Sequence, residues 1–288
     1  MPEKDHMTDP RRIDTIRASL GVDCDCIVVL ASREGRVVAR VTTPTGDVVA
    51  KVSTTAGAFN EEAAAMCTLA GLGLPVSEVL ALEGGPPALL ISSWADGEPI
   101  TAESNPAVLH AVGRILRRIH QIPAGPPFSA HPTVARWVES WFNEIFPWWE
   151  TEESVGPDLH RTAEAWMDAV RPVLEAQPGC LFLLDGRTDH FLVNDNGDIR
   201  LIDVADLQAG DAAMDFAVLE LDAPGILRHV LEGYAPSAAE REVFDDLIPF
   251  YAFLRALSAA GWCRVILNDE TSARRYLDSA RRSLVSQL

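Results

Sequence analysis

One lysine and two aspartates are the side chains of this sequence with the clearest chemical potential. Of the 24 lysines and arginines only Lys4 and Lys51 are lysines, and Lys51 lies in an alternating apolar segment. Asp185 and Asp203 each follow a short apolar segment typical of a strand. Carboxylates that meet at the ends of adjacent strands bind metal ions and move protons. These residues therefore predict a site with one fixed cation and two carboxylates.

Lys51 ends the segment Val49-Ala50-Lys51, from which it can project away from its packed neighbours. Glu62, on the helix expected next, can pair with the lysine ammonium and hold it in place. The alternative is a surface lysine with an unrelated glutamate at a helix start. Taken alone, the pair favours the second interpretation.

The segment 181–219 gives the aspartates their context. A first strand carries Asp185 into a loop, a second strand spans 191–193, and a return strand at 199–202 ends at Asp203. Aspartates in turns are often only turn formers. Phosphoryl transfer, however, needs a cation for phosphates, carboxylates for Mg²⁺ and a base for the acceptor hydroxyl. Lys51, Asp203 and Asp185 offer one candidate for each.

The elements that must position these residues change character along the chain. Alternating or Val/Ile-rich segments separated by glycine turns predict strands before residue 96, and amphipathic periodicity predicts helices after it. We therefore expect an α+β, two-lobed chain with a β-rich lobe at 1–96 and a larger, mostly helical lobe at 97–288. The expected strands are 26–31, 36–42, 47–52, 75–82 and 88–92, and the expected helices are 10–20, 58–72, 106–120, 133–149 and 159–176.

The composition of the chain indicates which classes of binding partner and which cellular compartment are compatible with it. The formal net charge of −18 argues against nucleic acid and anionic membrane surfaces, which require a basic protein face. The charge suits a cationic ligand, although an acidic surface can also serve solubility alone. No apolar run approaches the roughly 20 residues of a membrane span, and the polar N-terminus lacks the apolar stretch of a signal peptide. The five cysteines have no metal-ligand spacing, so a cytoplasmic protein with reduced thiols is expected.

The segment 185–219 resembles the catalytic core of the aminoglycoside phosphotransferase (choline kinase-like) family. The resemblance spans roughly residues 25–275 and includes the tripeptide at 74–76 and the hinge WADGEP at 94–99. It implies a protein-kinase-like fold and a small-molecule kinase. The residues that carry it in the core are Asp185, Ile202-Asp203-Val204, Gly210-Asp211 and Asp215-Phe216.

The resemblance implies a role for each site residue. Lys51 would contact the phosphates of ATP or GTP and Glu62 would hold it. Asp185 would orient or deprotonate the acceptor hydroxyl, and Asp203 with His190 would bind Mg²⁺. Main-chain groups near Ser93 and Ala95 would hydrogen-bond the edge of adenine or guanine.

The sequence departs from the family pattern at three positions. Leu183 and Leu184 stand where the family has histidine and glycine before the catalytic aspartate, so a loop-bracing hydrogen bond is lost but not the base. His190 stands at the asparagine that ligates metal, as in the macrolide-kinase branch. Imidazole is a softer ligand than Mg²⁺ prefers, so the site should depend more on Asp203.

The acceptor site is expected around residues 137–153, which contain five carboxylates and four tryptophans. Aromatic faces bind cations and the carboxylates attract amines. Trp137, Trp141 and Ile145 also fit an amphipathic helix that packs on the core. The residues beyond Pro147 fit that helix less well and predict a substrate-facing loop, with candidates Trp148, Trp149, Glu150 and Glu152.

Three functions are compatible with these observations. The first is an ATP- or GTP-dependent O-phosphotransferase acting on a cationic natural product or antibiotic, such as an aminoglycoside, a basic peptide or a macrolide. The second is a degraded kinase that binds nucleotide or a metabolite without phosphorylating it, as the changes at Leu183, Leu184 and His190 suggest. The third is a kinase of primary metabolism. The presence of Lys51 together with both aspartates favours the first.

Overall fold

The computed structural model describes residues 10–33, 35–123, 128, 133–153 and 157–287. The chain forms two compact units: unit 1 comprises Met1–Pro99 and His190–Asp206, and unit 2 comprises Ile100–Asp189 and Leu207–Leu288. The division expected from the sequence placed 97–288 in one lobe. Residues 190–206 group instead with the N-terminal residues, because they pair with the strand at 98–99.

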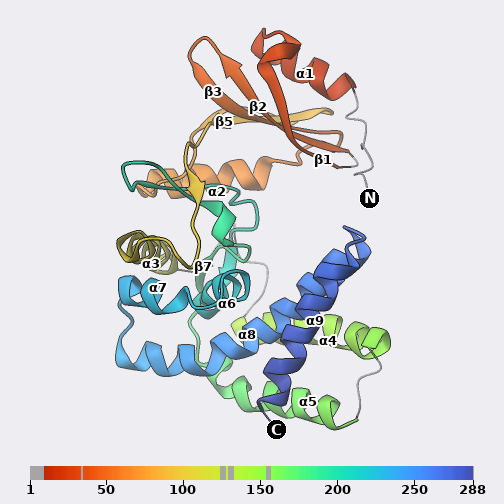
Figure 1. Cartoon of the computed structure of the whole chain (residues 1–288), viewed down its shortest axis with the longest axis vertical. Coiled ribbons are helices and arrows are strands. Elements are labelled where there is room, and N and C mark those ends of the chain that lie inside the picture. The colour runs from red at the N-terminus through yellow and green to blue at the C-terminus, as the bar shows by residue number, and fades with distance from the viewer. Residues whose placement is uncertain (1–9, 34, 124–127, 129–132, 154–156, 288) are drawn as a thin grey trace. The chain divides into compact units, whose positions relative to one another are not determined.

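Unit 1 is built on a five-stranded antiparallel sheet in the order β1-β2-β3-β5-β4 (Figure 1). In the central strand β3, Val48, Ala50 and Val52 are buried while Lys51 points to the opposite face, as the twofold period of a strand requires. The strands are β1 (Ile27–Arg33), β2 (Arg36–Thr43), β3 (Gly46–Ser53), β4 (Val79–Glu83) and β5 (Ala88–Ser93).

Helix α1 (Pro10–Leu20) covers the apolar face of this sheet (Figure 1). Its Ile16 is fully buried against the inward-facing side chains of the strands. Helix α2 (Asn60–Gly71) follows β3 and contacts β4. The buried sheet residues that form one apolar cluster with Ile16 are Ala39, Val41, Val48, Ala50, Val52, Leu89 and Ile91.

A second, three-stranded sheet in unit 1 has the order β6-β8-β9, with β6 at Glu98–Pro99, β8 at Phe191–Val193 and β9 at Ile199–Leu201. The backbone of Gly97 lies so near β8 that a Cβ atom there would be 2.7 Å from the Val193 carbonyl oxygen. Only glycine allows that approach, and its φ of +137° is also one that other residues avoid.

Unit 2 is mostly helical. Helix α8 contacts α6 and α9, α3 contacts α7, and a two-stranded ribbon of β7 and β10 completes the unit (Figure 1). Aromatic rings of α6, α7 and α8 interlock in its core. The elements are α3 (Pro106–His120), α4 (Val134–Glu153), α5 (Pro157–Glu175), β7 (Cys180–Phe182), β10 (Gln208–Gly210), α6 (Ala212–Asp222), α7 (Leu227–Tyr234), α8 (Ala238–Val265) and α9 (Glu270–Val285).

The expectation of a loop beyond Pro147 is wrong, because α4 continues to Glu153. A proline inside a helix removes one backbone hydrogen bond and costs about 3 kcal/mol. The apolar stripe nevertheless continues past it: Phe142, Phe146 and Trp149 are all buried, at the spacing i, i+4, i+7 that lines one helix face. Trp149 is the ring of this stripe that lies beyond the proline, and continuation of the helix buries it fully, which offsets the cost of the proline.

The fold class predicted from the sequence is confirmed: an antiparallel β-rich N-terminal part precedes a mostly helical C-terminal part. The exception to the predicted order is the β8–β9 hairpin, which belongs by contacts to unit 1. Within the described residues, no helix combines the length and the apolar character that crossing a bilayer requires.

Candidate active site

Lys51 and Glu62 form an ion pair in unit 1. The Lys51 Nζ lies 2.5 Å from Glu62 Oε1, and only 12% of the lysine side chain and 4% of the glutamate side chain are exposed. Helix α2 provides Glu62 in its first turn, where a carboxylate also interacts favourably with the helix dipole. The pairing expected from the sequence is thus present, and the lysine ammonium is held in one position.

The second oxygen of Glu62 faces another cation. Oε2 is buried and has no hydrogen bond from the described residues, and the guanidinium of Arg36, on β2, lies 3.6 Å away. Arg36 also lies over the ring of Phe59, with its guanidinium carbon 4.8 Å from the ring centroid. Glu62 is therefore a buried carboxylate between two cations.

Asp203 directly follows the β8–β9 hairpin, two residues after β9 ends, and shares Lys51 with Glu62. Its Oδ1 lies 3.0 Å from Lys51 Nζ, and about half of its side chain is exposed. Asp203 adopts φ +52°, an uncommon conformation for a residue with a Cβ atom. Partial burial raises the pKa of Asp203, whereas the positive charge of Lys51 and its hydrogen bond to the carboxylate lower it. The pKa of Asp203 is lowered overall. Asp203 is thus an ionised, accessible carboxylate.

The LPV tripeptide at residues 74–76 anchors the hairpin that carries Asp203. The Leu201 amide donates to the Pro75 carbonyl at 2.7 Å, and Val76 bridges to Leu201. The guanidinium of Arg200 donates to the Val76 carbonyl at 3.0 Å. The sequence predicted a strand from residue 75, but β4 begins only at Val79, because residues 75 and 76 bond to the hairpin instead.

His190 begins the same hairpin and is 6% exposed. The Ile202 amide donates to the His190 carbonyl at 2.9 Å, which ties the residue before Asp203 to His190. The imidazole Nε2 lies 3.8 Å from Asp203 Oδ2. The two predicted metal ligands are therefore neighbours within unit 1.

The donor set of unit 1 suits a nucleotide-bound Mg²⁺ at Asp203. Mg²⁺ prefers oxygen ligands, keeps several waters, and commonly uses one or two carboxylates together with substrate phosphates. Asp203 offers such a carboxylate, and its exposed half leaves room for waters. The His190 nitrogen is a poor Mg²⁺ ligand by comparison. Asp203 would thus be the main protein ligand.

The hinge residues Ser93 and Ala95 lie at the end of β5. The Ser93 amide donates to the Glu78 carbonyl at 2.9 Å, and the Ser93 hydroxyl accepts from the Glu78 amide at 2.9 Å. The Ser93 N–H is therefore already used within the unit. Ala95 is buried. A main-chain contact to a base at this hinge would have to come from the groups that follow the Ser93 amide.

The loop of Asp185 in unit 2 is braced by a buried carboxylate of α6. Asp215 is fully buried and accepts hydrogen bonds from the amides of Leu183 (2.9 Å) and Leu184 (3.0 Å). Leu184 adopts φ +61°, and the Asp185 amide donates to the Leu183 carbonyl at 2.7 Å. The aspartate bonds hold the unusual backbone immediately before Asp185.

The far side of this loop is fixed by the same helix. The Thr188 amide donates to Asp222 Oδ2 at 2.9 Å, and the Thr188 hydroxyl bonds the same oxygen. Asp215 and Asp222 lie seven residues apart, two turns of one helix face. Helix α6 therefore holds both ends of the loop with carboxylates.

The Asp185 carboxylate itself faces two arginines. Its Oδ1 forms a close ion pair with Arg255 of α8, and its Oδ2 lies 3.4 Å from the Nε of Arg187. About a quarter of the Asp185 side chain is exposed. Arg187 also reaches Asp189, at 3.4 Å, so it forms ion pairs within the loop. Asp185 is thus an oriented carboxylate with one oxygen less engaged than the other.

The leucines that depart from the family pattern have structural places. Leu183 is buried, and its side chain lies so close to Gly186 that a Cβ atom there would be 3.0 Å from Leu183 Cδ1. The glycine at position 186 therefore leaves room for the Leu183 side chain. Asp215 accepts hydrogen bonds from the amides of Leu183 and Leu184, so the loop backbone is braced in this chain without a histidine at position 183.

His120 completes the brace through partners that the sequence did not indicate. Its side chain is almost fully buried, with Nε2 3.0 Å from Asp215 Oδ2 and Nδ1 3.3 Å from the Tyr234 hydroxyl. Burial raises the pKa of Tyr234 to about 12, so the hydroxyl is neutral and can donate to Nδ1. The Nε2–H then donates to Asp215. Sequence reasoning missed Arg255 and Asp222, because no local spacing marks a residue whose partner lies 34 or 70 positions away.

The predicted acceptor residues on α4 do not share one environment. Trp149 is fully buried among Phe146 and Phe253, so its assignment to a substrate-facing loop is wrong. Trp148 is half-buried, and the guanidinium of Arg264 lies 6.0 Å from its ring centroid. The helical turn sends the two neighbouring tryptophans to different faces.

The acidic candidates differ too. Glu150 forms a close ion pair with His160 of α5, whose other nitrogen lies 3.2 Å from Glu164. Hydrogen bonding to Glu150 raises the pKa of His160. Glu152 belongs to α4 by its backbone, and its side chain lies outside the described part of the structure. Glu150 therefore has a structural partner and reaches the solvent only in part.

Known proteins resemble this chain in both sequence and fold. The model of the phosphotransferase enzyme family matches residues 26–242, about three quarters of the chain. The chain belongs to this family. The matched region of this phosphotransferase includes Lys51, Glu62, Asp185, His190 and Asp203. Comparison with the curated proteins gives no significant match.

Solved structures share the fold of this phosphotransferase at low identity. APH(2")-IIia in its GDP and kanamycin complex superposes with a TM-score of 0.73 at 12% identity, covering 96% of this chain and 99% of that one. The macrolide 2'-phosphotransferase MphH from Brachybacterium faecium gives 0.67 at 18% identity, covering 92% and 97%. The amicoumacin kinase hAmiN, in complex with AMP-PNP, Ca²⁺ and Ami, gives 0.68 at 16% identity, covering 100% and 96%. The enzyme class is that of a small-molecule kinase.

Proposed function

We propose that the chain transfers the terminal phosphoryl group of ATP or GTP to a hydroxyl of a small, cationic natural product or antibiotic. The observation that carries this proposal is the Lys51 ammonium, held by the buried Glu62 at 2.5 Å and by the accessible Asp203 at 3.0 Å. A fixed cation beside a carboxylate suited to Mg²⁺ is what a bound nucleoside triphosphate requires.

In this proposal Lys51 binds the nucleotide phosphates and Glu62 keeps its ammonium in place. Asp203 would hold Mg²⁺ with His190 beside it, and main-chain groups near Ser93 and Ala95 would meet the base. When bound, Mg²⁺ supplies charge neutralisation at the phosphates. The nucleotides GDP and AMP-PNP in the complexes of the structural neighbours support use of a nucleotide.

Asp185 would take the proton of the acceptor hydroxyl. Its Oδ1 is engaged by Arg255, while Oδ2 has the more distant Nε of Arg187 at 3.4 Å, so Oδ2 is the better proton acceptor. As the hydroxyl oxygen forms its bond to phosphorus, the bond to the leaving nucleoside diphosphate breaks and the proton passes to Oδ2. The brace of Asp215 and Asp222 would keep that oxygen in position.

A cationic acceptor is supported by charge. The net charge of −18 favours the approach of a cation over that of an anion. Kanamycin and hygromycin B are the acceptors bound in two of the structural neighbours. On α4, a cationic ligand at the half-buried Trp148 or the partly exposed Glu150 would have to compete with Arg264 for the ring and with His160 for the carboxylate.

A turnover screen tests the proposal. Purified protein with Mg²⁺ and ATP or GTP is assayed for phosphate transfer to aminoglycosides, basic peptide antibiotics and macrolides. Asp185→Asn and Asp203→Asn should each lower kcat by about 10²–10⁴, a range typical of losing one proton-transfer group or charge-stabilising ligand. Asp195→Asn, in the exposed turn of the β8–β9 hairpin, is the matched control and should retain activity.

The alternative is a degraded kinase that binds nucleotide without transferring phosphate. The residues that favour it are Leu183, Leu184 and His190, and the two arginines on Asp185. Nucleotide binding in a calorimeter with no transfer to any acceptor, under conditions where Asp203→Asn abolishes that binding, would replace our proposal with this one. Transfer that persists in Asp185→Asn would remove Asp185 from its assigned role.

A further inference from the structure

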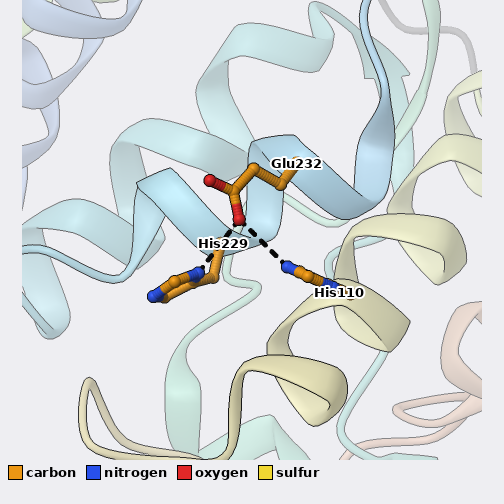
Figure 2. A group of neighbouring side chains, drawn as sticks. All are labelled: His110, His229 and Glu232. Atoms are coloured by element: carbon orange, nitrogen blue, oxygen red, sulfur yellow. Dashed lines mark hydrogen bonds and ion pairs between the residues drawn. The ribbon is translucent and has the colours of Figure 1, made fainter.

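Three potential metal ligands meet where α3 and α7 cross in unit 2. Figure 2 shows His110 on α3 and His229 and Glu232 on α7, with both imidazoles pointing at the carboxylate. Glu232 Oε2 lies 3.1 Å from His110 Nε2 and 3.1 Å from His229 Nδ1. One ligand atom from each residue lies within 4.8 Å of the other two. None of the three belongs to the site proposed for phosphoryl transfer.

The backbone fixes this arrangement. A Cβ atom on Gly113 would lie 2.0 Å from the Val230 carbonyl oxygen, and one on Gly233 would lie 2.1 Å from the His110 carbonyl oxygen. The two helices therefore touch backbone to backbone at two glycines. Because the contact is beside all three side chains, it holds His110 next to the one-turn pair His229 and Glu232.

Arg228 orients the Glu232 carboxylate through the oxygen that does not face the imidazoles. The Nε of Arg228 donates to Glu232 Oε1 at 3.3 Å, so Oε2 is the oxygen left to face the imidazoles. A partner that holds the second oxygen of a ligating carboxylate orients the first. All three side chains are also partly exposed, so an ion and a water can reach them.

We propose that His110, His229 and Glu232 bind a divalent transition-metal ion of the zinc class, with a water in the fourth position. Two imidazoles and one carboxylate form a common three-residue set for Zn²⁺, which is tetrahedral at about 2.0–2.2 Å from nitrogen and oxygen ligands. Such bond lengths place neighbouring ligand atoms about 3.3 Å apart. The two 3.1 Å separations lie close to this value, and the two imidazole nitrogens lie within 4.8 Å of each other.

The ion would link α3 to α7 as a cross-brace. A hard oxygen-seeking cation such as Mg²⁺ does not favour two imidazoles, so the site would discriminate against the metal used with the nucleotide. The competing explanation is that the carboxylate only accepts hydrogen bonds from two imidazoles. The two explanations differ in whether Zn²⁺ binds at these residues.

The experiment measures Zn²⁺ binding to tag-free protein by competition with a chromophoric chelator. All proteins carry Asp203→Asn, which removes the proposed Mg²⁺ ligand as a second site. We expect one Zn²⁺ per chain, bound about 100-fold or more weakly after His110→Gln or Glu232→Gln, since even the loss of an outer partner of a ligand costs 10–100-fold. His160→Gln is the matched control: that histidine also pairs with two glutamates, and its loss should leave the affinity unchanged.

Two further measurements make the result decisive. Zn²⁺ should raise the melting temperature of the parent protein and leave that of His110→Gln unchanged, while far-UV circular dichroism shows both to be folded. Co²⁺ should give the intense visible bands of a tetrahedral site in the parent only. Absence of Zn²⁺ binding, or equal affinity in the parent, His110→Gln and Glu232→Gln, would overturn the proposal whatever the outcome for phosphoryl transfer.

Discussion

The cations that face Glu62 determine both how much free energy its burial costs and what it contributes to the site. A carboxylate with only 4% of its side chain exposed is costly to bury, and the two cations that face it, Lys51 and Arg36, offset that cost. The same bonds take conformational freedom from the lysine, so its ammonium is in position before any phosphate arrives. Lys51 and Glu62 thus act as a unit, and each can be tested through the other.

Glu62→Gln should weaken nucleotide binding about 10-fold, or about 1.4 kcal/mol. The amide cannot hold the ammonium as an ion pair, so Lys51 would turn further to Asp203, which it already contacts at 3.0 Å. Nucleotide affinity measured by calorimetry in the presence of Mg²⁺ checks this. The exposed neighbour Glu61 offers the control, and Glu61→Gln should bind as tightly as the parent. Equal affinities for both variants would show that Glu62 does not position Lys51.

In unit 2, a single helix, α6, positions the loop that carries Asp185. Helix α6 presents Asp215 and Asp222 on one face, and these carboxylates bond the amides on either side of Asp185. His120, from α3, adds a bond to Asp215, and α3 in turn packs against α7 through glycines. The geometry of the Asp185 loop is therefore an outcome of helix packing in unit 2.

Gly113→Ala should destabilise unit 2 by about 1–3 kcal/mol or more. The new methyl group would lie 2.0 Å from the Val230 carbonyl oxygen, a backbone atom that can move only if α7 moves. The overpacking cost exceeds the gain of up to about 1 kcal/mol from replacing a helical glycine. Urea unfolding measures the difference.

The control for this prediction is Gly261→Ala in α8, where the added atom would lie at an ordinary 3.7 Å from the Trp148 ring. That variant should be as stable as the parent or slightly more stable. If Gly113→Ala unfolds at the same urea concentration as Gly261→Ala, helices α3 and α7 are not in backbone contact.

The stability contributed by the ion pair between Glu150 of α4 and His160 of α5 should depend on pH. Hydrogen bonding to Glu150, with a smaller contribution from Glu164, raises the pKa of His160 above its ordinary value of 6.5. Protonated His160 therefore contributes stability that is fully present below pH 6.5 and is lost as the pH rises through the folded-state pKa. The pair is partly exposed, so we expect below about 1 kcal/mol.

Comparison of the parent with His160→Gln checks this expectation. The parent should be the more stable of the two at pH 6, and the difference should shrink as the pH rises past the folded-state pKa of His160. An NMR titration of the imidazole gives that pKa directly. A difference that does not vary with pH, or an imidazole that titrates below 6.5, would contradict the ion pair.

At the scale of the whole molecule the dominant feature is charge. With 42 acidic and 24 basic residues, the chain carries a formal charge of −18. Such an excess opposes a compact state through self-repulsion while it disfavours anionic partners. Many of the described arginines are already paired with carboxylates, for example Arg117 with Glu240 and Arg171 with Glu139. The carboxylates that remain without a basic partner therefore give the molecule its net negative charge.

Raising NaCl from 10 to 200 mM should raise the melting temperature at pH 8, because a shorter Debye length screens the repulsion. The salt effect should vanish near pH 4.7, the isoelectric point of the sequence, where the net charge approaches zero. Calorimetric melts at the two pH values measure it. A melting temperature that falls with salt at pH 8 would mean that attractive ion pairs outweigh the repulsion.

The sequence by itself determined the α+β class, the position of most strands and helices, and the order of the residues that point to phosphoryl transfer. Alternation marked β2 and β3, and a 3.6-residue period marked α3 over residues 106–120, because these patterns follow from backbone geometry alone. Lys51 stood out by composition, and the expected Lys51–Glu62 pair is present. The catalytic and ligand roles of these residues stay predictions.

Only the tertiary structure decided which side chains meet across long stretches of chain. Trp149 became a core residue because α4 continues past Pro147 and carries its apolar stripe with it. Arg255 reached Asp185 across 70 positions, and His120 reached Asp215 across 95. The cluster of His110, His229 and Glu232 depends on a contact between two glycines 120 residues apart. Burial and pairing are set by the packing of distant segments, and the periodicity of one segment does not contain that information.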